Sequence, residues 1–154
     1  MKNKEISFTK EITFARPVTI KSIYATCKFI AILNGKYLLN SGSVTVYLTI
    51  KYYDESNNEC HSLSTNIYKT GTVADREEIV SGTLTIQNKD IKENITKISM
   101  ETSYTISGAN NYSSATFDLP TASLSCDQLT FNDDVKSAIL NNELFQKKVT
   151  VFVE

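Results

Sequence analysis

The 154-residue chain is poor in the residues on which most catalytic and cofactor sites depend. It has no tryptophan, a single histidine and only three cysteines. Protein zinc sites draw mainly on Cys and His, and general acid–base catalysis most often uses His. The sequence also lacks a glycine-rich phosphate loop and a Ser/His/Asp set. We therefore expect no enzyme, no catalytic residue and no cofactor.

Charge and the length of apolar runs exclude further classes. Sixteen Lys and Arg stand against 17 Asp and Glu, which gives a net charge of -1. That balance offers no basic surface for nucleic acid or for an anionic membrane. No apolar run approaches the ~20 residues of a membrane-spanning helix. With 41% hydrophobic residues the chain is too apolar to be disordered, and its length suits one domain. We predict a single domain over residues 1–154 with neither nucleic acid nor a membrane as partner.

The cysteines and the N-terminal residues indicate the cellular compartment in which the protein folds. The chain has an odd number of cysteines, namely Cys27, Cys60 and Cys126, and no two of them are spaced like metal ligands. This pattern is typical of free thiols in a reducing cytoplasm. Residues 1–10 lack the apolar segment of a signal peptide. The sequence therefore predicts a protein that folds in the cytoplasm, and that is part of a virion if a phage encodes it.

Alternating apolar residues in the first third predict strands. Even positions carry the apolar side chains from Ile6 to Phe14, with Lys10 interrupting, and Ala15-Arg16-Pro17 is expected to stop this strand. From Ile23 to Leu33 the apolar residues occupy odd positions. A change from even to odd predicts a β-bulge near Ser22.

The second of these segments also carries apolar residues on its other side. Ile30 and Ile32 suggest a strand covered on both faces. Asn34-Gly35 is typical of a hairpin turn. Turns are otherwise built from Asn, Asp and Ser, because the chain has only 5 glycines and 2 prolines.

The clearest alternation runs from Val44 to Tyr52, and a polar loop at 54–59 follows it. Leu63 to Lys69 is a shorter strand, which Thr70-Gly71-Thr72 should turn. Further strands are expected around 80–86, 98–106 and 115–119.

The tail has a different pattern. Asn132, Asp133 and Asp134 suit a helix start, and apolar residues follow at helical spacing, which predicts a short helix near 133–142. Val149, Val151 and Val153 alternate as a closing strand. The predicted fold is all-β: a jelly-roll-like antiparallel β-sandwich at about 5–125, followed by one short C-terminal helix and a closing strand at about 130–154.

One order of segments resembles a known family. The first segment, Val44 to Asp54, ends in Tyr-Tyr-Asp and is followed by a polar loop. Two apolar segments come next, Leu84 to Ile86 and Ile95 to Thr102. The last segment, Ala115 to Leu119, contains Phe-Asp. Over residues 5–125 this resembles the galactose-binding-like jelly rolls found among carbohydrate-binding modules. The resemblance implies glycan binding used for attachment, although the family's usual tryptophan platform is missing here and tyrosine would have to replace it.

The same resemblance implies a structural calcium between the first and last strands. Asp118 matches a late acidic position, and Glu11 is a second candidate ligand. Calcium takes six to eight oxygen ligands, and the sequence does not supply the rest by pattern. The calcium is therefore left open, and no metal residue is assigned.

Three short motifs have ordinary structural explanations. Cys60-His61 would need both side chains on one side for nucleophilic catalysis, but neighbouring strand residues point to opposite faces. Glu77 and Glu78 belong to a charged run, Asp75-Arg76-Glu77-Glu78, that is typical of a solvated turn. Asp133-Asp134 is explained by helix capping.

Tyr47, Lys51 and Tyr53 share the side of their strand opposite to the apolar residues, and they are the predicted binding residues. Cross-strand packing alone is the simpler explanation of this face. Two functions remain: a structural assembly protein of a bacteriophage virion (capsid decoration, collar or tail), or a glycan-binding module. Partners are accordingly other copies of the chain, other virion proteins, or a glycan in a tyrosine-lined groove.

Overall fold

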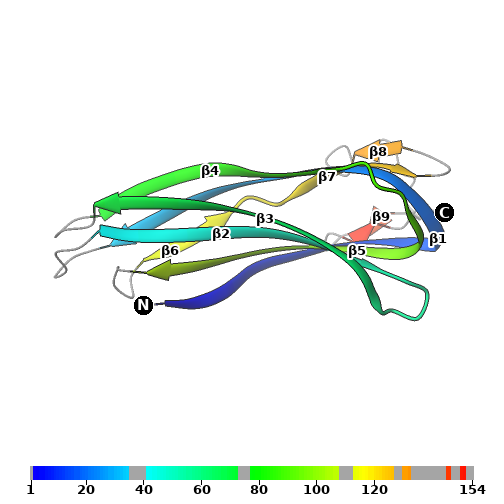
Figure 1. The fold of residues 1–154 in the computed structure, drawn as a ribbon, viewed down its shortest axis with the longest axis horizontal. Coiled ribbons are helices and arrows are strands. Elements are labelled where there is room, and N and C mark those ends of the chain that lie inside the picture. The colour runs from blue at the N-terminus through cyan, green and yellow to red at the C-terminus, as the bar shows by residue number, and fades with distance from the viewer. Residues whose placement is uncertain are drawn as a thin grey trace.

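The computed structural model describes residues 2–34, 41–72, 77–107, 113–126, 130–132, 145–146 and 150–151 (Figure 1). Every regular element among them is a strand, and no helix occurs in these ranges. The long strands are β1 (Lys2–Asn34), β2 (Ser41–Tyr53), β3 (Glu59–Thr72), β4 (Glu77–Asn88) and β5 (Lys92–Ser107). The short ones are β6 (Ser114–Phe117), β7 (Thr121–Cys126), β8 (Thr130–Asn132), β9 (Phe145–Gln146) and β10 (Thr150–Val151). The predicted all-β class is confirmed.

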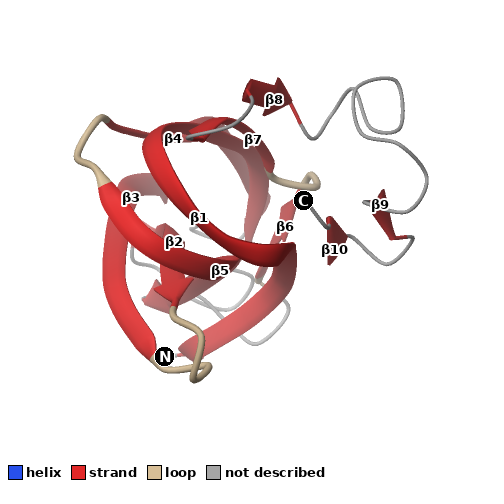
Figure 2. Ribbon diagram, turned by 90° about the vertical axis from the view of Figure 1, so that its right-hand side faces the viewer, coloured by secondary structure: helices blue, strands red, loops and turns tan. Residues whose placement is uncertain are grey.

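One antiparallel sheet curls around the core, because β1 is shared by both of its halves (Figure 2). The first half of β1 pairs with β5, which continues through β2 to β3. The second half pairs with β4 on one edge and with β7 and then β6 on the other. Ile20 contacts β5 and β7 at once, so these two strands lie on opposite edges of β1. β5 and β4 therefore pair with the same edge of β1, β5 along its first half and β4 along its second half.

Two of the register shifts along β1 allow this bend. Between Thr13 and Val18, β1 advances five residues while β5 advances two, from Lys97 to Ile95. Pro17 lies inside this bulge, where its missing N–H breaks no ladder bond. The predicted strand end at Ala15-Arg16-Pro17 is therefore wrong, because a bulge accommodates the proline. The second irregularity falls between Ile20 and Ser22 and confirms the bulge predicted there.

The core follows the shift in alternation. On β1 the buried residues are Ile12, Phe14, Val18 and Ile20 at even positions, and then every odd position from Ile23 to Leu33. They pack with Val44 to Tyr52 of β2, Leu84 and Ile86 of β4, and the inward residues of β5. Lys10 is buried in the same row and donates a hydrogen bond from Nζ to the Pro120 carbonyl at 2.9 Å. Thr102 is fully buried on β5, and its hydroxyl has no hydrogen-bond partner among the described residues.

The buried residues of β2 are the apolar residues of its alternating sequence pattern. Val44, Val46, Leu48, Ile50 and Tyr52 are each 0% exposed, whereas the residues between them are half-buried. Each strand residue turns its side chain to the face opposite that of its neighbour. The predicted full burial of Leu48 is therefore confirmed.

Several local predictions are corrected. Ile30 is 52% exposed, so β1 is not covered on both faces there. Thr70-Gly71-Thr72 continues β3 instead of turning it, because it pairs with Ser41 to Ser43 of β2. β1 and β2 are not paired with each other in the described residues, and the turn expected at Asn34-Gly35 falls partly outside those residues. Leu119 lies beyond the end of β6 and is 44% exposed.

The end of the chain contains both a missed strand and a partial match. β7 was not predicted, yet it buries Ala122, Leu124 and Cys126 against the core. The helix expected at 133–142 lies outside the described residues. Of the closing strand expected at 149–153, residues Thr150–Val151 form β10, which pairs with β9.

Candidate functional site

The three predicted binding residues lie on one outward face. Tyr47, Lys51 and Tyr53 project from β2 away from the core, flanked by β3 on one side and β5 on the other. We call this surface the tyrosine face: Tyr47, Lys51 and Tyr53 with their outward neighbours on β3 and β5. All three side chains are half-buried, because the side chains of two adjacent strands pack beside them.

Lys51 lies between two carboxylates. Its Nζ is 3.9 Å from Glu59 Oε1 on β3 and 4.0 Å from Glu101 Oε2 on β5. Ion pairs between side chains that are this exposed contribute little to the stability of the fold, typically below about 1 kcal/mol. The two contacts favour one lateral position for the ammonium group, and the three strands thus share a polar row across the face.

A second row of interacting side chains runs from Tyr53 through Lys97 to Glu11. Lys97 Nζ lies 4.3 Å above the Tyr53 ring, and the same nitrogen is 3.8 Å from Glu11 Oε2 on β1. A cation over an aromatic face is attracted by the ring's quadrupole. This row therefore extends the tyrosine face from β2 across β5 to the first half of β1.

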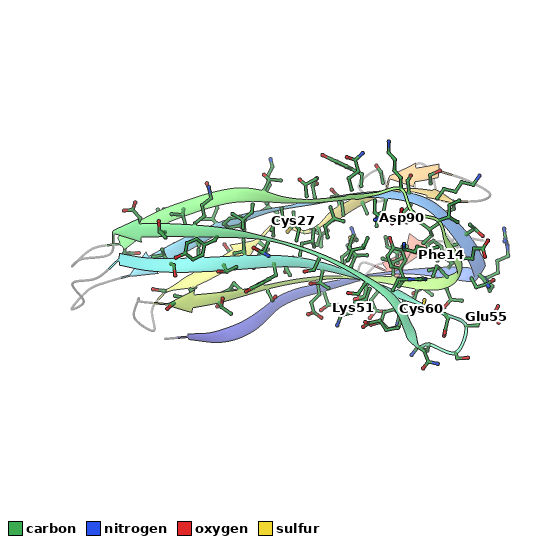
Figure 3. The ribbon with its side chains drawn as sticks, in the orientation of Figure 1. Phe14, Cys27, Lys51, Glu55, Cys60 and Asp90 are labelled. Carbon is green, nitrogen blue, oxygen red and sulfur yellow. The ribbon has the colours of Figure 1, made fainter. Side chains whose placement is uncertain are left out.

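The β2–β3 hairpin fixes one end of this face. Asp54 Oδ1 accepts hydrogen bonds from the backbone N–H groups of Ser56 and Asn58 at 2.9 and 3.0 Å. Thr96 donates its hydroxyl hydrogen bond to the Asp54 carbonyl at 2.7 Å and so ties the turn to β5. Figure 3 shows Lys51, Cys60 and Glu55 close to this end of the molecule. The predicted polar loop is confirmed for 54–58, since Glu59 already begins β3.

Tyr68 belongs to the same face and was missed by sequence reasoning. It pairs with Thr45 on β2, and its side chain is 62% exposed. In the described residues β3 is hydrogen-bonded to β2 alone, although β4 packs near its other edge, so Tyr68 has a hydrogen-bonded strand partner on one side only. The sequence shows a tyrosine in a strand, but not that the strand is at an edge.

Cys60 and His61 do not form a nucleophilic pair. Tyr52 pairs with His61 and Tyr53 with Glu59, which makes Cys60 the extra residue of a bulge. Its Sγ donates to the Tyr52 carbonyl at 3.4 Å, while the His61 ring packs edge-on against Tyr52. Partial desolvation, followed by the nearby Asp54, raises the pKa of Cys60. The thiol is therefore less ionised at neutral pH than an ordinary cysteine.

The other cysteines are buried. Cys27 donates from Sγ to the Asp118 carbonyl at 3.2 Å, and desolvation together with the Asp118 charge raises its pKa to about 12. All three cysteines are free thiols, as predicted. The described residues contain no group of three or more His, Cys, Asp and Glu side chains that could hold a metal ion. Asp118 does not become part of such a group with Glu11, which faces Lys97 instead.

The acidic motifs do not converge. Glu77 and Glu78 open β4 as neighbouring strand residues, opposite Asn34 and Leu33 of β1, so they point to opposite faces. Residues 75–76 and the Asp133-Asp134 pair lie outside the described residues. The described chain thus offers no pair of carboxylates at this motif facing a common substrate.

Two shallow grooves lie on the outward side of β1, away from the tyrosine face. The larger holds about 310 Å³ and is lined by residues of β1, β4 and the segment 116–118, including Lys28, Ile30 and Asp118. The smaller holds about 120 Å³ and lies between β4 and β7, with Tyr24, Gln87 and Lys89 in its lining. Each groove has at most one carboxylate and neither contains histidine.

Comparisons with known proteins identify no family. No family model matches the chain, and no curated protein matches it. Among solved structures it is similar to a chain in the structure of the infectious bursal disease virus Gx strain, with 16% identity and a TM-score of 0.41. The match covers 84% of this chain and 27% of that one. At this distance the similarity establishes neither fold family nor function. Within the described residues, no helix is long and apolar enough to span a membrane.

Proposed function

We propose that this chain is a non-catalytic structural protein that assembles through its tyrosine face with other copies of itself or with other virion proteins. The observation that carries the proposal is Tyr68, an exposed aromatic side chain on an edge strand, beside half-buried Tyr47 and the rows built on Lys51 and Tyr53. Aromatic residues are enriched in protein interfaces, and side chains already held in place lose less entropy on binding.

The distribution of titratable groups supports a non-catalytic role. Glycoside hydrolysis generally needs two carboxylates about 5–9.5 Å apart across the substrate. Neither groove contains such a pair, and the acidic groups of the tyrosine face lie beside lysines. No enzymatic activity follows from this arrangement.

The more specific part of the proposal concerns the virion. We assign the chain to a bacteriophage particle as a capsid decoration, collar or tail protein, with a jelly-roll-like sandwich in which β1 passes between the two layers. The composition, rich in Asn, Lys, Ile and Tyr, is typical of an AT-rich genome. In this hypothesis the chain is synthesised and folds in the host cytoplasm and is then incorporated into the particle.

Native mass spectrometry across a range of protein concentrations tests the assembly proposal. We expect oligomers of the unaltered chain, and we expect Tyr68→Ala and the double variant Tyr47→Ala/Tyr53→Ala to shift the distribution toward monomer. Central aromatic residues typically contribute 2 kcal/mol or more to an interface, which corresponds to at least about a 30-fold weaker association.

The matched control is Tyr24→Ala, which removes an exposed tyrosine from the other half of the sheet. Its oligomer distribution should equal that of the unaltered chain. Circular dichroism must show that all variants keep their strand content. Oligomers that survive both tyrosine-face variants unchanged, or a chain that is monomeric at every concentration and binds no virion protein, would contradict the proposal.

A further inference from the structure

Most strand edges of the curled sheet carry features that discourage pairing with another chain. An unpaired edge presents free backbone N–H and C=O groups, and natural proteins shorten, bulge or charge such edges to block them. β6 and β8 are only 4 and 3 residues long. β3 has a bulge at Cys60, and its half-buried Lys69 lies in the inward row, opposite buried Val44 of β2. The first half of β1 has the bulge around Pro17 and the buried Lys10.

β4 has none of these features. Its ladder with β1 runs over all 12 of its residues without a register shift. Neither a proline nor a charged residue occurs from Ile79 to Asn88. In the part of the chain that the structure describes, no strand is hydrogen-bonded to its other edge. β3 packs beside the beginning of β4, where Ile67 approaches Gly82, and the two strands then diverge (Figure 1). The open part of this edge is therefore residues 83–88.

The open edge of β4 is complementary to itself. Leu84 and Ile86 are buried, whereas Thr83, Thr85 and Gln87 are exposed on the outer face. If residues 83–87 of two copies pair antiparallel about a twofold axis at Thr85, every residue lies opposite one on the same face. Leu84 is then opposite the partner's Ile86, Thr83 is opposite the partner's Gln87, and Thr85 is opposite its own copy. Such apolar and Thr–Thr pairs are favourable across strands, and no like charges meet.

A second copy fits this edge better than an unrelated peptide. Peptides that add a strand to a sheet are selected by pockets for alternate side chains. The two described grooves that include β4 residues lie on the β1 side of that strand and not along its open edge. A twofold pairing needs only the edge itself, and twofold dimers are the commonest homo-oligomers. Pairing of residues 83–87 would add roughly five backbone hydrogen bonds.

We propose that two copies of this chain associate by antiparallel pairing of their β4 edges, over residues 83–87, about a twofold axis at Thr85. The joined sheet then has the strand order β7-β1-β4-β4-β1-β7 across the two copies. This inference rests on the proposed assembly function, of which it names one contact. The β4 edge lies on the other half of the curled sheet from Tyr47, Tyr53 and Tyr68, so one chain has room for both contacts.

Disulfide cross-linking at the twofold axis tests the register. The background is Cys60→Ser, which removes the exposed one of the three thiols. In it, Thr85→Cys should form a disulfide-linked dimer under oxidised glutathione, because opposite residues of antiparallel strands have Cα atoms about 4.5–5.5 Å apart. The matched control is Thr83→Cys, which is equally outward-facing on the same strand. Its own copy lies four residues along the ladder, about 13 Å away, so this variant should stay monomeric in non-reducing electrophoresis.

Charge at the twofold axis gives an independent test in solution. Thr85→Lys and Thr85→Glu each place two like charges opposite one another. We expect each variant alone to self-associate at least about fivefold more weakly than the unaltered chain in sedimentation equilibrium. A mixture of the two variants should associate again, because opposite charges then meet. Recovery in the mixture shows that both variants are folded.

Three results would overturn the inference. They are the absence of a Thr85→Cys dimer at the highest soluble concentration, equal cross-linking of Thr83→Cys, and unchanged association of both charge variants. Adding Tyr68→Ala to the Thr85→Cys variant separates this contact from the tyrosine face, since the cross-linked dimer should persist while larger oligomers are lost. Loss of oligomers in Tyr68→Ala without any cross-linking would contradict the β4 contact alone. Cross-linking in a chain whose oligomers ignore the tyrosine variants would contradict the tyrosine face alone.

Discussion

Thr102 should be a site at which a single substitution makes the protein more stable. Its side chain is 0% exposed on the core face of β5, in register with Leu48 of β2 and Phe8 of β1, and its hydroxyl has no partner among the described residues. A buried polar group without a hydrogen bond costs about 1–3 kcal/mol. Thr102→Val replaces the hydroxyl with a methyl group of similar shape and removes this cost.

We therefore expect Thr102→Val to raise the free energy of unfolding by about 1–3 kcal/mol, measured by urea denaturation followed by circular dichroism with an unchanged m value. For a chain of this size, each kcal/mol corresponds to a rise in Tm of about 2–4 °C. Thr105→Val, on the half-buried outward side of the same strand, is the control and should change stability by less than about 0.5 kcal/mol. A loss of stability in Thr102→Val would contradict this prediction, because it would show that the hydroxyl is hydrogen-bonded in the folded protein.

Three further predictions concern packing and pH. Leu48→Ala should cost about 2–5 kcal/mol of stability, and Thr49→Ala on the other face less than half of that; equal losses in urea denaturation would mean that both faces are buried. Gly82→Ala should cost about 1–3 kcal/mol, because the added Cβ would stand 3.0 Å from Cε1 of buried Phe29; an equally stable variant would show that the ring can move aside. The thiol of Cys27 has its pKa raised from 9.0 to about 12 in the fold, so the unfolded chain loses that proton first and stability should fall as pH rises from about 9 to 12. Cys27→Ala should flatten this part of the pH profile, and an unchanged slope would contradict the assignment.

The sequence predicted those parts of the fold that depend on alternation alone. A buried face imposes a period of two, so the inward rows of β1, β2 and β5 were identified, and a change of phase revealed the bulge at Ser22. Pro17 misled the prediction because only a paired position excludes proline, and pairing is not visible in the sequence. Lys10 looked like an interruption, but its partner, the Pro120 carbonyl, is 110 residues away.

β7 and the surfaces depend on contacts that the sequence does not contain. Residues 121–126 alternate small and polar side chains with Ala122, Leu124 and Cys126, a weak pattern that becomes a strand because β1 offers an edge. Tyr47, Lys51 and Tyr53 were correctly placed on one side of β2, since alternation decides that. Their contacts with Glu59, Glu101 and Lys97 come from neighbouring strands whose register only the fold fixes. The same is true of the grooves along β1, which combine three separate strands.

Hydroxyl-radical footprinting of the tyrosines is the most direct test of assembly through the tyrosine face. Tyr68 and Tyr24 are 62% and 47% exposed in the single chain and lie on different halves of the curled sheet, so each serves as the reference for the other. When dilute protein is compared with protein at concentrations where oligomers form, we expect Tyr68 to become protected while the reactivity of Tyr24 stays the same. Protection of Tyr24 with Tyr68 unchanged, or oligomers in which neither tyrosine is protected, would contradict it.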